Sequence, residues 1–193
     1  LMLARDFFGI KPVYYAEIDG HFVFASEIKS ILAFPGYERK VNQKALEQYL
    51  SFQYSPLEET FFKGIYKLMP GHMLLYKNGS YEIKTYFKPK LTPGQWDYKT
   101  NMAQLRSQLS EILKDSVKHH MLSDVEVGAF LSGGVDSGYL ASSSGADQAF
   151  TVGFDEGDRY SEVNKAAKVA EKAGLKHHVK IISKQEFWDA LPD

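Results

Sequence analysis

Short apolar runs rich in aromatic and β-branched residues, separated by polar turn residues, dominate the first ninety residues, and they predict β-hairpins. Aromatic and β-branched residues flank an Asp-Gly step at 19–20 and an Asn-Gly step at 78–79. Such steps favour the two-residue turns that join antiparallel strands. The four expected strands are residues 13–17, 21–25, 72–76 and 81–87.

Two stretches between these hairpins predict helices instead. Residues 27–34 run up to Pro35-Gly36, a pair that ends a helix. Residues 43–52 follow Asn42, a residue type that favours the N-cap position. The first part of the chain is therefore expected to be of the α+β class.

Beyond residue 100 the apolar residues recur at helical spacing. Leu105, Leu109, Ile112, Leu113 and Val117 share one face of an expected helix. Asn101 and Gln104 have the spacing of a capping box at its start.

Short apolar runs then alternate with helical patterns up to the end of the sequence. The expected strands are residues 125–131, 149–154 and 178–182. The expected helices are residues 137–144, which end at Gly145, residues 161–173, which end at Gly174, and a last one opened by Ser183 and Glu186. The residues expected to face the core from the second of these helices are Val163, Ala166, Ala167 and Ala170. This alternation predicts an α/β unit with right-handed crossovers and a parallel sheet.

Residues 88–94 hold two prolines and a glycine among lysines, which is typical of a linker; an ordinary surface loop is the alternative. We therefore expect one domain at residues 1–88, a linker at 89–100 and a second domain at 101–193. With 44% hydrophobic residues, the 193-residue chain can form one sizeable core or two small ones.

Composition narrows the function classes. The net charge of −1, from 23 basic and 24 acidic residues, gives no global field that would attract nucleic acid. The chain has no cysteine, which excludes disulfides, thiolate metal ligands and thiol catalysis within it. No apolar run approaches the roughly 20 residues of a membrane span, and the first residues lack a signal-peptide layout. We expect a cytoplasmic protein that binds neither membrane nor nucleic acid.

The segment Ser132-Gly133-Gly134-Val135-Asp136-Ser137 carries the clearest chemistry. It lies where an expected strand ends and an expected helix begins, which is where parallel sheets bind ligands. The glycines permit a sharp turn and close approach, and the backbone N–H groups at a helix start attract anions. Ser132 and Ser137 can donate hydrogen bonds to phosphate oxygens.

Asp136 adds a metal to this prediction. A carboxylate repels phosphates unless a cation lies between them, and Mg²⁺ binds both kinds of oxygen. The loop therefore predicts a Mg²⁺-bound polyphosphate, with pyrophosphate as a leaving group. It is neither a Walker loop nor a dinucleotide-binding glycine motif. A serine- and glycine-rich turn without a ligand is the alternative.

Two histidine pairs, at 119–120 and 177–178, suggest metal ligation at first sight. Adjacent residues point about 100° apart on a helix and to opposite faces of a strand, so neither pair chelates by itself. We interpret them as solvated or core histidines.

Ser-Gly-Gly-Val-Asp-Ser resembles the pyrophosphate loop of the N-type ATP pyrophosphatases. Residues 3–15 resemble the Leu-Ala-Arg-Asp-Arg-Phe-Gly-Ile-Lys-Pro-Leu-Tyr-Tyr stretch of glutamine-hydrolysing asparagine synthetases. Further stretches that resemble this family follow in order at residues 24–29, 61–68, 70–72 and 150–154. The resemblance extends over nearly the whole chain.

The resemblance implies the end of an N-terminal-nucleophile glutaminase sandwich followed by the start of an ATP-pyrophosphatase domain. It implies that aspartate is adenylated with ATP and Mg²⁺, and that ammonia from glutamine then displaces AMP to give asparagine. A homodimer is also implied. The implied ATP-binding residues are Leu131, Ser132, Gly133, Gly134, Val135, Asp136, Ser137, Val152 and Gly153, with Asp136 on Mg²⁺ and the backbones of Leu131 and Val152 facing the adenine.

The sequence departs from this family in three respects. Phe7 stands where the family has arginine, and the family's amino-terminal catalytic cysteine and its second phosphate motif, Ser-Gly-x-Gly-x-Asp-Glu, are absent. We therefore expect an internal part of a larger enzyme, with no catalytic residue for glutamine hydrolysis and no activity by itself. A related β-lactam or peptide-cyclising synthetase and a truncated, non-catalytic interaction module are the alternatives.

Overall fold

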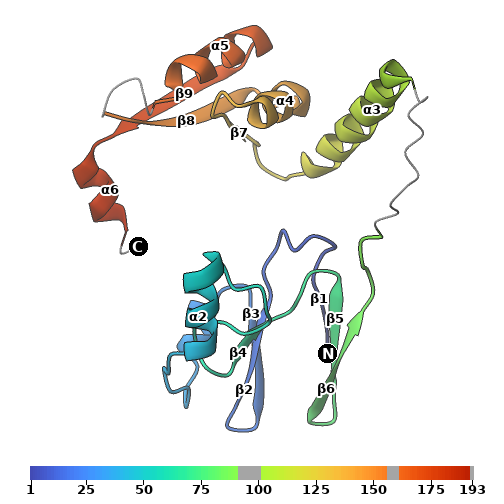
Figure 1. The fold of residues 1–193 in the computed structure, drawn as a ribbon, viewed down its shortest axis with the longest axis vertical. Helices are drawn as coiled ribbons and strands as arrows, with labels where there is room; N and C mark the ends of the chain where they lie inside the picture. The colour runs from blue at the N-terminus through green and yellow to red at the C-terminus, as the bar shows by residue number, and fades with distance from the viewer. Residues whose placement is uncertain (91–100, 156–160, 192–193) are drawn as a thin grey trace. The chain divides into compact units, whose positions relative to one another are not determined.

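The computed structural model describes residues 1–90, 101–155 and 161–191 (Figure 1). The chain divides into two compact units, Leu1–Gly94 and Gln95–Asp193, and each is described by itself. Most of the linker expected at 89–100 lies outside the described residues. The structure is a mixed α/β one with three separate three-stranded sheets among those residues.

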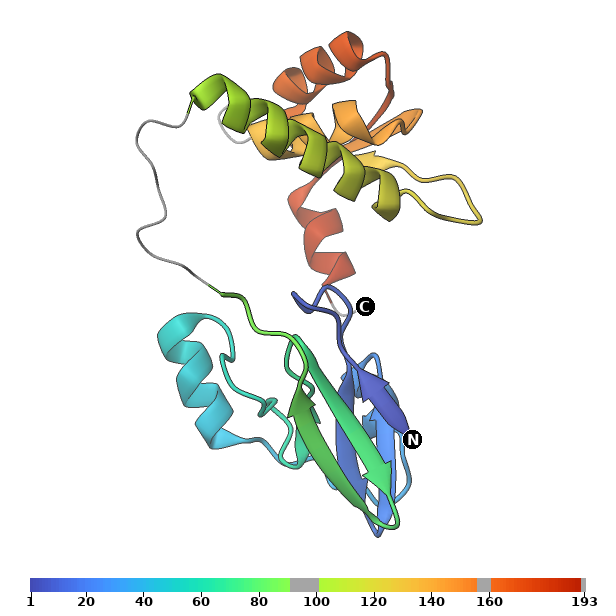
Figure 2. The same ribbon diagram turned by 90° about the vertical axis from the view of Figure 1, so that its right-hand side faces the viewer.

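The first unit holds two antiparallel sheets, seen in two views in Figures 1 and 2. One has the order β1-β5-β6, with strands at Met2–Ala4, His72–Lys77 and Ser80–Thr85. The other has the order β3-β2-β4, with strands at His21–Ala25, Tyr14–Ile18 and Ile65–Lys67. Helices α1 (Ile28–Leu32) and α2 (Gln43–Phe52) lie between β3 and β4 in sequence.

Both predicted hairpins are confirmed. β2 pairs with β3 through a turn at Asp19-Gly20, and β5 pairs with β6 through a turn at Asn78-Gly79. All four turn residues have positive φ, from 48° to 78°. This is the turn geometry that matches the right-handed twist of the flanking strands, and it explains why Asp-Gly and Asn-Gly stand there. The helix predicted at 43–52 has these bounds, although Asn42 makes no side-chain cap.

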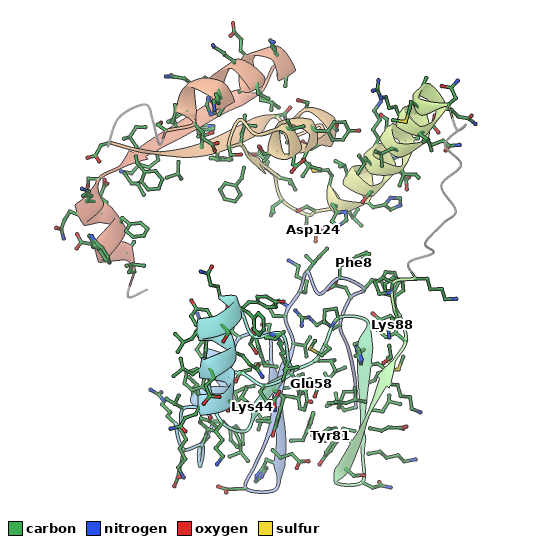
Figure 3. The ribbon with its side chains drawn as sticks, viewed as in Figure 1. Phe8, Lys44, Glu58, Tyr81, Lys88 and Asp124 are labelled. Carbon is green, nitrogen blue, oxygen red and sulfur yellow. The ribbon has the colours of Figure 1, made fainter. Side chains whose placement is uncertain are left out.

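Side chains from both sheets meet in one core cluster. Its three most buried members are at most 2% exposed: Tyr15 of β2, Leu74 of β5, and Leu68, which precedes β5 in the sequence. Side chains of β1 and β6 pack against them. Tyr15 also makes an edge-to-face contact of 5.5 Å with Tyr81, labelled on β6 in Figure 3. A second cluster lies on the other face of β2 and contains Ala16, Ile18, Ile31 and Ile65. β2 is thus buried on both faces.

The segment after β1 is fixed by hydrogen bonds from Arg5 and to Asp6. The Arg5 guanidinium donates to the carbonyls of Gly9, Lys11 and Leu68 at 2.8–3.1 Å. The Asp6 carboxylate accepts from the N–H groups of Phe8, Ile10 and Lys11, and these bonds lower its pKa. Phe7 packs its ring 4.4 Å from that of Phe87, a contact that accounts for an apolar residue at this position.

The second unit is built on a parallel sheet. Its strands are β7 (Ala129–Phe130), β8 (Gln148–Phe154) and β9 (Lys176–Ile182), in the order β7-β8-β9. Its helices are α3 (Met102–His120), α4 (Val135–Ser144), α5 (Val163–Ala173) and α6 (Lys184–Ala190). Gly145 and Gly174 end α4 and α5 in the left-handed conformation, as predicted. The Asn101 side chain accepts from Ala103 N–H at the start of α3.

The strand predicted at 125–131 is wrong in extent. Only Ala129 and Phe130 pair with β8, opposite Ala149 and Phe150. β8 begins at Gln148, which the register places beside Gly128, so residues before Gly128 have no strand beside them, and Val125 is 76% exposed. The run was expected to be buried, but Phe130 is 86% exposed and Leu131 alone is fully buried.

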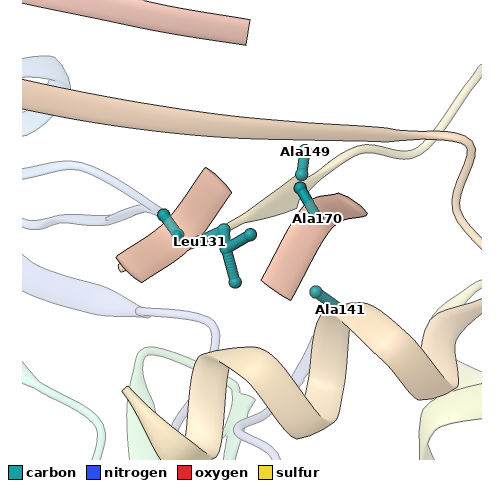
Figure 4. Close-up of a cluster of buried hydrophobic side chains, with 5 residues drawn as sticks. Leu131, Ala141, Ala149 and Ala170 are labelled. Carbon is teal, nitrogen blue, oxygen red and sulfur yellow. The ribbon is translucent and has the colours of Figure 1, made fainter. Parts of the chain in front are cut away.

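The core of this unit contains one large side chain among four alanines (Figure 4). Leu131 is 2% exposed, and it packs with Ala141 of α4, Ala149 of β8, and Ala166 and Ala170 of α5. Ala166 and Ala170 were expected to be buried, but Ala167 is exposed. A helical residue next to Ala166 is rotated by about 100° away from it, and Val169 fills the core position instead.

The apolar face predicted for α3 is only partly covered within the described residues. Val117 is buried, whereas Leu109 and Ile112 are 57% and 66% exposed. The helix itself is confirmed over Met102–His120.

Glu186 is expected to stay ionised far below the pH at which glutamates ordinarily titrate. Its carboxylate accepts hydrogen bonds from Lys180 Nζ at 2.7 Å and from Ser183 N–H at 2.9 Å, in the capping box predicted for α6. These bonds lower its pKa from 4.5 to about 2. Because the folded pKa lies below the unfolded one, the stabilisation of α6 is fully present above pH 4.5 and is lost as the pH falls through about 2. A ¹³C NMR titration of the Glu186 carboxyl measures this pKa. Lys180→Met should raise the pH at the midpoint of that titration. An unchanged midpoint would contradict the role of Lys180 in lowering the pKa.

Candidate ATP-binding site

The loop singled out in the sequence joins β7 to α4 at the carboxyl edge of the parallel sheet (Figure 1). Leu131 follows the strand directly, Gly134 is the N-cap of α4, and Val135 begins the helix. Gly134 has no side chain with which to cap the N–H groups of the first turn. The N-terminal end of the helix therefore presents N–H groups suited to an anion.

Gly133 is required by both conformation and packing. Its φ is +78°, and an added Cβ would lie 2.6 Å from Lys165 Cβ and 2.9 Å from the Ala166 backbone nitrogen. The loop therefore rests directly on the start of α5. A side chain at this position would push the loop away from that helix.

The two loop serines converge. Ser132 Oγ and Ser137 Oγ lie 2.9 Å apart, Ser132 N–H donates to Ser137 Oγ, and Gly134 N–H lies 3.4 Å from Ser132 Oγ. Each hydroxyl can rotate toward a ligand because these contacts leave donor or acceptor capacity on both oxygens. The two serines therefore form a small polar cradle at the helix start.

Asp136 lies in the first turn of α4 and is exposed. In residues 1–90, 101–155 and 161–191, no three His, Cys, Asp or Glu side chains gather closely enough to hold a metal ion. Mg²⁺ in nucleotide sites binds one or two carboxylates together with phosphate oxygens and water. A single carboxylate beside the anion cradle fits that mode of binding.

A cavity of about 370 Å³ opens beside the loop. Its lining residues come from the end of β7, the loop, the first turn of α4, β8 and the residue before α5: Phe130, Leu131, Ser132, Ser137, Phe150, Val152, Phe154 and Glu162. Of the nine predicted site residues, Leu131, Ser132, Ser137 and Val152 line this cavity. Gly133 and Gly134 belong to the adjoining loop, Val135 and Asp136 to the first turn of α4, and Gly153 lies on the opposite face of β8.

Gly153 has a packing role on that face. An added Cβ would lie 2.6 Å from Val163 Cγ2 and 2.7 Å from Ile181 Cδ1. Leu131 likewise turns its side chain into the core, and its N–H donates to the Phe150 carbonyl at 2.9 Å.

Three aromatic residues of the cavity, Phe130, Phe150 and Phe154, were not predicted from the sequence. Phe150, Val152 and Phe154 are 40–53% exposed and share one face of β8. The signal that could have found them is their spacing of two residues, which places side chains on one face of a strand. This apolar wall suits a flat heterocyclic ring.

The histidine pairs are engaged separately, as the sequence suggested. His119 and His120 each contact a carbonyl of their own helix through Nδ1 at 2.8 Å. His178 contacts Gln148 Oε1 and stacks on Phe150, whereas His177 contacts Thr151 on the opposite face of the sheet.

Residues 1–87 match a glutamine amidotransferase domain family, and residues 108–193 match an asparagine synthase family. Asparagine synthetase (glutamine-hydrolyzing) 1 of Bacillus subtilis is 38% identical over 98% of this chain and 30% of its own length. A putative asparagine synthetase (glutamine-hydrolyzing) of Mycobacterium bovis is 35% identical over 100% of this chain and 31% of its own. Amidase chyE of Penicillium rubens is 31% identical over 93% of this chain and 29% of its own. The chain thus spans about three tenths of the length of these relatives.

Proposed function

We propose that this chain, which belongs to the family of glutamine-hydrolysing asparagine synthetases, takes part in ATP-dependent synthesis of asparagine from aspartate. Glutamine would supply the nitrogen, and AMP and pyrophosphate would be released. Residues 1–88 would be the trailing part of a glutaminase sandwich, residues 89–100 the linker, and residues 101–193 the first part of the ATP-pyrophosphatase domain.

The geometry of the loop between β7 and α4 carries this proposal. Ser132, Ser137 and the first-turn N–H groups of α4 would hold the pyrophosphate portion of ATP. Gly133 lets the loop lie against α5, which fixes where those groups point. The backbones of Leu131 and Val152 would face the adenine, beside the aromatic wall of the cavity.

Asp136 would hold Mg²⁺ at the edge of this cradle. When bound there, the ion would neutralise charge on the phosphate oxygens and on the departing pyrophosphate. Asp136 is exposed and lies in the first turn of α4, directly before Ser137, so its carboxylate is open to a cation from solvent.

Asp136→Asn is expected to weaken the affinity of the chain for pyrophosphate in the presence of Mg²⁺ by at least about tenfold, or ~1.4 kcal/mol. The amide is a poorer Mg²⁺ ligand than the carboxylate. Without Mg²⁺ the variant should bind as well as the wild type or better, because a negative charge beside the phosphates has been removed. Isothermal titration calorimetry with and without Mg²⁺ measures both effects.

Asp124→Asn is the matched control, since Asp124 is exposed and precedes β7 outside the loop (Figure 3). It should leave both affinities unchanged. An equal loss for Asp136→Asn with and without Mg²⁺ would contradict the metal role, and no binding by the wild type would favour an interaction module.

The identity of the acid is tested separately. In the complete gene product, exchange of labelled pyrophosphate into ATP should require aspartate. Exchange with another carboxylic acid but not with aspartate would favour a related amidotransferase-type synthetase.

The purified chain is expected to release no glutamate from glutamine. The family's glutaminase uses an amino-terminal cysteine nucleophile, and this chain contains no cysteine. A coupled glutamate assay, with the Bacillus subtilis relative as positive control, measures this. Glutamate release above the buffer background would overturn the expectation.

Within residues 1–90, 101–155 and 161–191, no helix is both long and apolar enough to cross a membrane. The family resemblance supports a homodimer located in the cytoplasm for the complete protein. Light scattering of the complete gene product tests the dimer, and a monomeric mass would contradict it.

A further inference from the structure

A chain of two hydrogen bonds connects β9 with the residue that opens the phosphate loop. Thr151 Oγ1 lies 2.6 Å from the Leu131 carbonyl oxygen, and His177 Nε2 lies 2.8 Å from the same hydroxyl. Thr151 and His177 lie on the face of the sheet that α4 and α5 cover. Thr151 is two residues from Ala149 on β8, and His177 is the partner of Ala149 on β9, so all three side chains point to the same face. The three residues come from the three successive strands or their ends.

The direction of both bonds follows from the chemistry of the groups. A carbonyl oxygen only accepts, so the Thr151 hydroxyl hydrogen must point to Leu131. The hydroxyl oxygen then accepts, and His177 Nε2 must carry the hydrogen that it donates. The sequence of donors is therefore His177 Nε2–H to Thr151 Oγ1–H to the Leu131 carbonyl.

The Leu131 carbonyl needs this donor because it is buried. Leu131 is 2% exposed and Thr151 is 4% exposed, so water does not reach the bond. The pairing of β7 with β8 ends at Phe130 and Phe150, one residue before Leu131. A buried carbonyl without a donor destabilises the fold, so the hydroxyl compensates for the end of the strand pairing.

The other hydrogen bonds of the loop serines lie within the loop. Those of Ser132 and Ser137 join atoms of residues 132–137 to one another and shape the loop without attaching it to the sheet. Its attachments to the rest of the unit are the bond from Leu131 N–H to the Phe150 carbonyl, the Thr151 bond, and the contact of Gly133 with α5. Thr151 thus holds the carbonyl of the peptide that joins Leu131 to Ser132.

We infer that Thr151 and His177 are positioning residues for the phosphate loop, acting through the Leu131 carbonyl. The inference rests on the proposed function, because it assigns their effect to anion binding by Ser132–Ser137. Thr151 fixes the plane of the peptide whose nitrogen belongs to Ser132, and His177 holds the Thr151 hydroxyl in the donating orientation. Neither side chain touches the ligand.

The test compares Thr151→Val with Thr151→Ser in the full chain. Valine keeps the shape and removes the hydroxyl, whereas serine keeps the hydroxyl. Thr151→Val should weaken calorimetric affinity for Mg²⁺ with pyrophosphate about tenfold, and Thr151→Ser should restore it to within about twofold. His177→Gln, which keeps an N–H donor, should bind more tightly than His177→Leu.

Thr60→Val is the matched control. Thr60 is also buried, at 6% exposure, and its hydroxyl donates to the Ile65 carbonyl at 2.8 Å in the first unit. It should leave pyrophosphate affinity unchanged. Wild-type affinity in a folded Thr151→Val variant would overturn the inference, as would equal losses in Thr60→Val and Thr151→Val.

Two measurements need no ligand, so they separate this inference from the proposed function. ¹⁵N NMR of wild-type His177 should show the hydrogen on Nε2, and a neutral ring with its hydrogen on Nδ1 would overturn the inference. Hydrogen exchange at the Leu131 and Ser132 amides should quicken about tenfold in Thr151→Val and not in Thr151→Ser. If the wild type binds no pyrophosphate but both results hold, the proposed function fails and the attachment of the loop stands.

Discussion

Replacing Gly133 by alanine is expected to weaken pyrophosphate binding strongly and to destabilise the second unit. The positive φ of Gly133 costs an L-residue about 1–2 kcal/mol. The new methyl group would also meet the backbone of α5 at 2.9 Å, and overpacking of this kind costs about 1–3 kcal/mol. The loop can relieve the contact only by moving away from α5. That movement displaces the N–H groups and the two serines from the positions in which they would bind the anion together. Affinity for pyrophosphate with Mg²⁺ should fall at least about a hundredfold, or ~2.7 kcal/mol, by calorimetry.

Gly145→Ala is a control that has the backbone strain of a positive φ but no steric contact with another element. Gly145 also has a positive φ, +72°, but no atom lies within 4 Å of the position its Cβ would occupy. This variant should lose about 1 kcal/mol of stability and keep its affinity. Equal affinities for the two variants would show that contact with α5 does not place the loop.

Leu131→Ala should be the most destabilising truncation in the second unit. Leu131 is the one large side chain in a buried cluster whose other members are all alanine (Figure 4), and only Val169 and Leu175, at the edge of this cluster, are large enough to fill part of the space it leaves. Such substitutions cost about 2–5 kcal/mol, with the higher values where the cavity cannot collapse. Trp188 lies in α6 of this unit, so its fluorescence in urea measures the unfolding.

Leu122→Ala is the control for the same chemical change. Leu122 is 92% exposed, and its truncation should alter the free energy of unfolding by less than about 0.5 kcal/mol. A loss below about 1 kcal/mol for Leu131→Ala would contradict the picture of a rigid, alanine-lined core.

Local signals in the sequence predicted much of the fold. Asn78-Gly79 and Asp19-Gly20 specify their turns through backbone conformation alone, so the hairpins did not depend on distant residues. Gly145, Gly174 and the Ser183–Glu186 pair marked helix ends for the same reason. The strand at 125–131 failed because strand length depends on the partner, and β8 begins at Gln148.

The features of the candidate site likewise divide into those set by adjacent residues and those set by residues far apart in the sequence. The position of the loop Ser132–Ser137 between a strand and a helix could be predicted because its six residues are adjacent in the sequence. The wall of Phe130, Phe150 and Phe154 and the bond from Thr151 to Leu131 join residues about twenty positions apart. Their proximity depends on the register of β7 against β8, which the sequence pattern alone does not set.

The alanines in the core of the second unit also determine how rigidly α5 supports the loop Ser132–Ser137. Alanine has no side-chain rotamers, so Ala149, Ala166 and Ala170 can neither adjust to a change nor absorb it. An enlargement at any of them must move a whole helix or strand, and α5 is the element on which Gly133 rests. The position of the proposed phosphate ligands Ser132 and Ser137 therefore depends on three buried methyl groups that no ligand could touch.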